Sequence, residues 1–170
     1  TDISGLEYFT NLKDLNLAYH AITDITPLAG LTKLTSLSLG GNPVADISPL
    51  SNLTDLEFLP LFNCQATDYS PLANLTKLGG LLLDHSTISD VSVLSGLTEL
   101  WWLSLSNTFV SDVSPLAGLT NLRQLQLANC PITDYSPLAA IYPNLKEKDF
   151  SLDGSPEQPE PPEQPEVSEN

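Results

Sequence analysis

Basic residues are scarce in this 170-residue chain. Six Lys and Arg stand against twenty-one Asp and Glu, which gives a formal net charge of -15 at pH 7. Such a chain repels nucleic-acid phosphates and anionic membrane surfaces, so no nucleic-acid partner is expected. Methionine is absent altogether. Because a regular sequence pattern already runs through residues 1–4, we expect this chain to be an internal piece of a longer protein.

Long hydrophobic runs are also lacking. The longest apolar stretches, such as residues 79–83, fall far short of the roughly 20 residues that cross a bilayer. The first residues show no basic segment followed by an apolar one, which is the pattern of a secretory leader. We therefore expect no insertion into a membrane.

One repeat of 22 residues organises most of the chain. An aspartate marks each repeat, at Asp2, Asp24, Asp46, Asp68, Asp90, Asp112 and Asp134. Leu-x-x-Leu-x-Leu triplets begin at Leu12, Leu34, Leu56, Leu78, Leu100 and Leu122. A period of this length with regular leucines is typical of leucine-rich repeats. The predicted fold is a right-handed α/β solenoid, with a parallel sheet on the concave face and short 3₁₀ or α turns on the convex face.

Each triplet predicts one short strand, so the sequence indicates six parallel strands. Side chains alternate between the two faces of a strand. Leu37 and Leu39 therefore point to the core, while Ser36 and Ser38 point to the open face. After each strand comes a Ser-Pro or Thr-Pro pair, such as Ser48-Pro49, with Ser92-Val93 as a departure. We expect the hydroxyl to cap a short helix and the proline to occupy its first position.

These repeats resemble the internalin family of Gram-positive surface proteins. The resemblance rests on phrases such as Asp46-Ile47-Ser48-Pro49-Leu50 and Leu53-Thr54-Asp55-Leu56, which recur in register from residue 1 to about 150. It implies a secreted or cell-surface bacterial protein that binds a protein ligand, such as one on a host cell surface, in adhesion. No enzymatic activity and no cofactor are implied. The column that is usually Asn departs from the family, because only Asn42 retains it.

The two ends of the repeat region differ from its middle. Residues 1–152 are expected to form the array, and residues 146–150 replace the leucines with polar residues, as a closing coil does. At the other end, Ile3, Leu6 and Leu12 should be partly exposed, since no capping segment precedes them. Residues 153–170 are acidic and proline-rich, which predicts an extended linker or stalk.

Cys64 and Cys130 occupy the same position of the repeat, three coils apart. At about 4.8 Å per coil, their separation should be roughly 14 Å, too far for a disulfide. We expect two buried free thiols. The aspartate column is interpreted as structural, with each carboxylate accepting backbone N–H groups. No metal site and no catalytic triad are predicted, since His20 and His85 lack a partner set.

The open face of the sheet carries large apolar residues that the repeat does not require. They gather in the third to fifth coils, and the candidate ligand-binding residues are Phe58, Phe62, Gly80, Leu82, Trp101 and Trp102. Exposed aromatic clusters tend to mark interaction sites. Phe58 and Trp102 lie two coils apart, about 9 to 10 Å, so we expect an open notch between them over Gly80.

Other functions remain open at this stage. A glycan could stack on Trp101 or Trp102 while Asp84, Asn107 and Gln126 bind its hydroxyl groups. The array could also be a passive spacer that holds another domain at a distance. A cytosolic scaffold is a further alternative, because eukaryotic phosphatase-regulating proteins also use 22-residue repeats. The acidic proline-rich end and the recurrent Ser-Pro-Leu argue against it.

Overall fold

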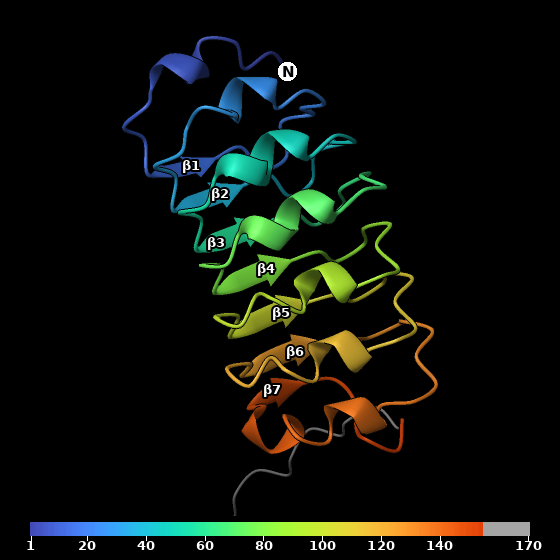
Figure 1. The fold of residues 1–170 in the computed structure, drawn as a ribbon. Coiled ribbons are helices and arrows are strands. Elements are labelled where there is room, and N and C mark those ends of the chain that lie inside the picture. Colours follow the sequence, from blue (N-terminus) through green and yellow to red (C-terminus); the bar gives the residue numbers. More distant parts are fainter. Residues whose placement is uncertain (155–170) are drawn as a thin grey trace, which may run out of the picture.

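The computed structural model describes residues 1–154, which form an elongated stack of coils (Figure 1). One side of the stack is a parallel sheet of seven strands in sequence order. The strands are β1 (Asp14–Asn16), β2 (Ser36–Ser38), β3 (Phe58–Pro60), β4 (Gly80–Leu82), β5 (Trp102–Ser104), β6 (Gln124–Gln126) and β7 (Glu147–Lys148). The six strands predicted from the leucine triplets are confirmed, and β7 adds a seventh.

Short 3₁₀ helices form the opposite side of the stack, so the expected short turns are confirmed. They are η1 (Leu6–Tyr8), η2 (Thr26–Leu28), η3 (Ser48–Asn52), η4 (Ser70–Asn74), η5 (Ser92–Leu94), η6 (Ser114–Leu116), η7 (Ser136–Leu138) and η8 (Tyr142–Asn144). Only about ten residues separate the start of such a helix from the start of the next strand, which leaves room for little more than one tight turn.

The core lies between the sheet and the 3₁₀ helices. Leucines at equivalent positions pair in register, as Leu59 does with Leu81 and Leu81 with Leu103. All three are fully buried. Because each coil is thin, a leucine packs mainly on the coils above and below it, so the core is one continuous column.

The helix starts are stabilised differently from the expectation. None of η2 to η7 has a side-chain hydrogen bond from its N-cap residue, and the Ser or Thr is itself the first helical residue. The aspartate two residues earlier accepts its backbone N–H, for example Asp46 Oδ1 from Ser48 at 2.8 Å. The proline therefore occupies the second helical position, where its missing N–H costs nothing.

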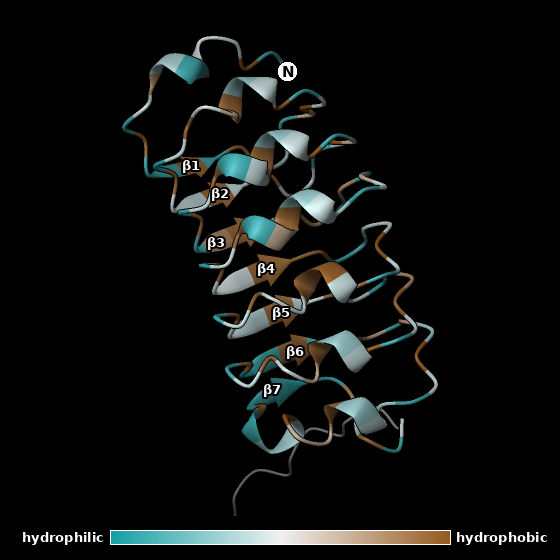
Figure 2. Ribbon diagram, in the orientation of Figure 1, coloured by the Kyte–Doolittle hydropathy of each residue, from teal (hydrophilic) through white to brown (hydrophobic). Residues whose placement is uncertain are grey.

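The C-terminal end of the stack is closed by polar and aromatic residues. In the earlier coils, an N–H such as that of Leu105 donates to a backbone carbonyl of the next coil. At the last coil the carboxylate of Asp149 takes over this role and accepts the N–H groups of Leu127 at 2.7 Å and Ala128 at 3.0 Å. Phe150 stacks on Tyr135 with 5.1 Å between ring centroids. Figure 2 shows β7 as hydrophilic, in contrast to the brown β3.

The opposite end is only partly open. Leu6 and Leu12 are half-buried, as predicted, but Ile3 is buried, because the turn at residues 2–6 folds it back onto the core. Tyr8 and Phe9 are exposed there. The predicted linker falls mostly on residues 155–170, which lie outside the described residues, so the division at residue 152 remains a prediction.

Candidate ligand-binding surface

Three aromatic residues form a contiguous cluster on the open face of the sheet. Phe58 begins β3 and Trp102 begins β5, and both pair across the strand with Gly80. The ring centroids of Phe58 and Trp102 are 5.8 Å apart, and those of Trp101 and Trp102 are 5.9 Å apart. Both pairs are tilted, within the range in which aromatic rings attract one another. We call these three residues the aromatic cluster.

The cluster keeps much of its surface in solvent. Trp101 is 46% exposed, and Phe58 and Trp102 are half-buried. The indole N–H of Trp102 donates to Oε1 of Gln126 at 3.2 Å, which fixes the orientation of this ring. The cluster is therefore an ordered apolar surface, and the indole N–H of Trp102 already has a hydrogen-bond partner within the protein.

The open notch expected over Gly80 does not exist. A Cβ atom at Gly80 would lie 2.5 Å from Cδ2 of Phe58, so the Phe58 ring covers the glycine. Trp101 covers Gly79 in the same way, at 2.7 Å from its Nε1 atom. The rings close the gap because folding onto bare backbone removes apolar area from water. The repeat correctly predicted that Phe58, Gly80 and Trp102 are neighbours on adjacent strands, but it did not predict the direction of the Phe58 side chain.

Phe62 belongs to a second aromatic pair. Its ring lies 5.6 Å from that of Tyr19 and covers Gly40, so it faces away from the aromatic cluster. Tyr19 is 73% exposed and adopts φ of 61°, in the left-handed region. Leu82 is half-buried at the end of β4. The six candidate residues thus fall into three groups. The first is the aromatic cluster with Gly80 beneath it, the second is Phe62 with Tyr19, and the third is Leu82 alone.

The polar groups suggested for sugar binding have partners within the protein. A carboxylate oxygen of Asp84 accepts the hydroxyl of Ser104. Asn107 accepts a hydrogen bond from Nδ2 of Asn129 at 2.9 Å and contacts Nε2 of His85 at 3.4 Å. His85, Asn107 and Asn129 all have positive φ and occupy one column. This exposed ladder of polar side chains was not foreseen, although the Asn that recurs at the equivalent positions 63, 107 and 129 was the available signal.

At the repeat position that is usually Asn, other side chains of this protein accept some of the backbone hydrogen bonds. Buried Asn42 accepts the N–H groups of His20 and Ile22 and donates to two carbonyl oxygens. Cys64 accepts the N–H of Ala66 in the same position, and burial raises the pKa of its thiol. Both cysteines are free, as predicted, but Cys130 is only half-buried. Its coil is the last one before the closing coil, and Ile132 and Tyr135 of this coil are half-buried as well.

The aspartate column is structural. Hydrogen bonds from the hydroxyl and the backbone N–H of Ser48 lower the pKa of Asp46, and they outweigh repulsion from Asp24 and Asp68. The pKa values of the other six aspartates of the column are lowered by the same kind of bonds. Within residues 1–154, no group of three or more His, Cys, Asp or Glu residues is placed to hold a metal ion.

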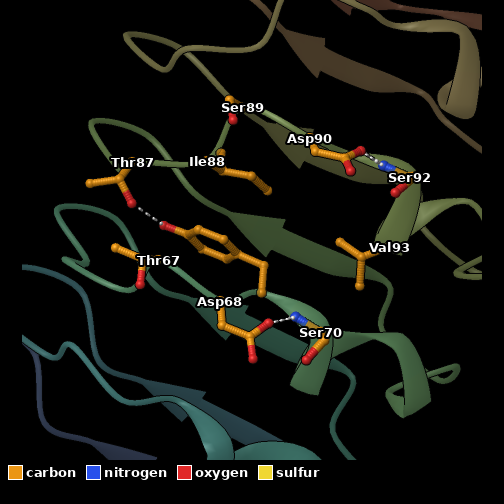
Figure 3. Close-up of a pocket in the computed structure, with 10 residues that line it drawn as sticks. Thr67, Asp68, Ser70, Thr87, Ile88, Ser89, Asp90, Ser92 and Val93 are labelled. Atoms are coloured by element: carbon orange, nitrogen blue, oxygen red, sulfur yellow. Dashed lines mark hydrogen bonds between the residues drawn. The ribbon is translucent and has the colours of Figure 1, made fainter.

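A small polar hollow lies where the Ser-Pro pattern breaks. Its volume is ≈ 290 Å³, and residues 67–70, 87–90, 92 and 93 line it. The hydroxyl oxygens of Tyr69 and Thr87, both in this lining, lie 3.3 Å apart. The other lining residues are labelled in Figure 3. The carboxylates of Asp68 and Asp90 are bonded to the N–H groups of Ser70 and Ser92. The hollow therefore offers few free groups for chemistry.

Family models for leucine-rich repeats match the chain. A model of two such repeats matches residues 32–74 and 102–147, and a single-repeat model matches residues 10–25. No curated protein sequence matches the chain significantly. The structure describes no helix long and apolar enough to span a membrane in residues 1–154.

Solved structures extend the likeness. Internalin C2 from Listeria monocytogenes is 45% identical with a TM-score of 0.82, over 85% of this chain and 64% of that one. A second L. monocytogenes internalin is 33% identical with a TM-score of 0.75, over 89% and 51%. A leucine-rich-repeat protein from Leptospira interrogans is 25% identical with a TM-score of 0.77, over 85% and 38%. The chain thus spans less than two thirds of these proteins, and it belongs to the leucine-rich-repeat family, with repeats of the internalin type.

Proposed function

We propose that this array is the ligand-binding module of a secreted or cell-surface bacterial protein and binds a protein partner in adhesion, without catalysis. The observation that carries the proposal is the aromatic cluster. Three large rings touch one another on the open face of the sheet and remain partly in solvent, and such patches tend to mark interaction sites. Trp is also among the residues that dominate binding energy at interfaces.

Rigidity of the surface supports the same function. The rings of Phe58 and Trp101 rest on the backbone of Gly80 and Gly79, and the Trp102 indole is held by Gln126. Side chains that are fixed before binding lose little conformational entropy when a partner arrives. Phe62 with Tyr19, and Leu82 between the two groups, extend the proposed contact area along the face.

A glycan ligand is the lesser alternative. Flat rings above glycine could stack on a sugar, but Asp84, Asn107 and Gln126 already bind neighbouring side chains. A sugar would have to displace these bonds, and unmatched polar groups in an interface cost affinity.

Binding of the 170-residue chain to a panel of purified host-receptor ectodomains and to a glycan array tests the proposal. For a receptor that binds, Trp102→Ala should weaken affinity at least tenfold, about 1.4 kcal/mol or more. Phe109→Ala is the matched control, because Phe109 is 65% exposed but lies outside the strands. Binding to glycans alone, or equal effects of both substitutions, would contradict the proposal.

A further inference from the structure

Most of the positive charge lies along one edge of the sheet. Five of the six basic residues stand one or three positions before a strand, at Lys13, Lys33, Lys77, Arg123 and Lys146. Since all strands run parallel, these positions share one edge, which we call the strand-entry edge. The segments that follow each strand contain no Lys or Arg and hold the aspartate column. Because the rest of the chain is strongly acidic, an anionic group of a partner would find basic side chains mainly at this edge.

The cations of this edge are incompletely neutralised by contact. Nζ of Lys33 donates to the amide oxygen of Asn11 at 2.5 Å, and Nη1 of Arg123 donates to the carbonyl oxygens of Thr120 and Leu122. These partners are uncharged, so they orient the cations without cancelling their charge. Lys77 differs, because it pairs with Asp55 at 2.7 Å.

Two shallow hollows form a groove along the part of the strand-entry edge from Lys13 to Trp101. One, of ≈ 440 Å³, is lined by residues that include Lys13 and Lys33. The other, of ≈ 640 Å³, is lined by residues that include Trp101. Glu57 and Lys77 line both, so the two hollows join. The exposed Trp101 therefore provides an apolar contact at the far end of this groove. Arg123 and Lys146 follow Trp101 along the same edge, outside both hollows.

We propose that the strand-entry edge binds an extended acidic segment of a protein partner. Carboxylates of the segment lie against Lys13 and Lys33 at one end and against Arg123 and Lys146 at the other, and an apolar residue between them contacts Trp101. That the partner is a protein rests on the proposed function. The inference adds a second contact surface beside the aromatic cluster, with its location and its chemistry.

The middle of the strand-entry edge determines how the acidic groups are spaced. Asp55, Glu57 and Glu99 lie there, so a uniform polyanion such as a sulfated glycan is repelled between the two basic ends. Lys33 and Arg123 are four coils apart, about 19 Å at ~4.8 Å per coil. An extended chain covers that distance in about six residues. The segment therefore carries two acidic groups separated by about six neutral residues.

A pair of synthetic peptides tests this spacing. The first has two acidic residues at each end and six neutral residues, one of them Leu, between them. The second has the same composition with the four acidic residues adjacent. At about 0.1 M salt, where charges act over only ~10 Å, the first peptide should shift the indole N–H resonance of Trp101 saturably. Its affinity should exceed that of the second peptide at least fivefold.

Matched variants distinguish the effect of charge at the strand-entry edge from the effect of the net charge of the protein. Lys33→Glu with Arg123→Glu should weaken binding of the first peptide at least tenfold. Thr67→Glu, Ser89→Glu, Ser111→Glu and Thr133→Glu together change the net charge equally at exposed positions after the strands, and should change affinity less than twofold. Phe109→Ala, at an exposed residue outside the strands, should leave peptide affinity unchanged. The peptide is measured without the receptor, so failure of the aromatic cluster as a receptor site remains a separate result.

Three results would overturn the inference. They are no saturable shift of Trp101 with the first peptide, equal losses in the two charge variants, and binding of a heparin fragment in place of either peptide. The last would indicate an anionic glycan as the occupant of the edge.

Discussion

At the scale of single residues, glycine and aromatic side chains form complementary pairs across neighbouring coils. Phe58 covers Gly80 and Trp101 covers Gly79, while Phe62 covers Gly40. A ring can lie this close to the backbone only where the facing residue has no Cβ. The shape of the open face is thus determined by pairs of residues one repeat of 22 positions apart, although each residue alone looks unremarkable at its repeat position.

Gly80→Ala should destabilise the array by about 1 kcal/mol, because the new Cβ displaces the Phe58 ring. In a Phe58→Ala background the same substitution should change stability by less than about 0.3 kcal/mol. Urea unfolding of the four proteins in this double-mutant cycle measures the coupling. Additive effects of the two substitutions would show that the ring does not rest on Gly80.

At the scale of elements, the aspartate and the residue two positions later act as one unit that starts each 3₁₀ helix. The carboxylate accepts the N–H of the first helical residue, as in Asp90 with Ser92 at 2.8 Å. This bond holds even at η5, where Val93 replaces the proline. The carboxylate therefore contributes to every helix start from η2 to η7, while proline only assists.

These bonds predict a loss of stability in acid. A carboxyl whose pKa is lowered by folding stabilises the native state above its unfolded pKa, about 3.9, and loses this contribution as pH falls through the folded value. Urea midpoints should thus decrease as pH falls below about 4. Asp46→Asn with Asp90→Asn should reduce the size of this decrease, since an amide oxygen accepts the same N–H without titrating. An unchanged decrease in the double variant would count against this role.

Strands that follow the 22-residue repeat were predictable from the sequence. Features that depend on the direction of a side chain, or that lie at the ends of the stack, were not. The period of 22 and the leucine triplets predicted β1 to β6, because alternation fixes which residues are buried. β7 was missed as a strand because an extra residue near Ile141 shifts its register and polar residues replace the leucines. The closed notch was missed because a column of residues does not say whether Phe58 leans toward Gly80.

At the scale of the whole molecule, the stack presents three distinct surfaces. The open face carries the aromatic cluster, the strand-entry edge carries most of the basic residues, and the opposite edge carries the aspartate column. Repetition keeps each residue type in its own line, because every coil places equivalent positions directly above one another. A partner that bridges the open face and the strand-entry edge would meet apolar and cationic contacts together, with Trp101 at the boundary.

Hydroxyl-radical footprinting of the protein with a bound receptor tests the central claim most directly, since oxidation of aromatic side chains reports their exposure to solvent. We predict that the partner lowers oxidation of Phe58, Trp101 and Trp102 several-fold and leaves Phe109 unchanged. Protection of Phe109 with unchanged oxidation of the aromatic cluster would contradict the assignment of the open face as the binding surface.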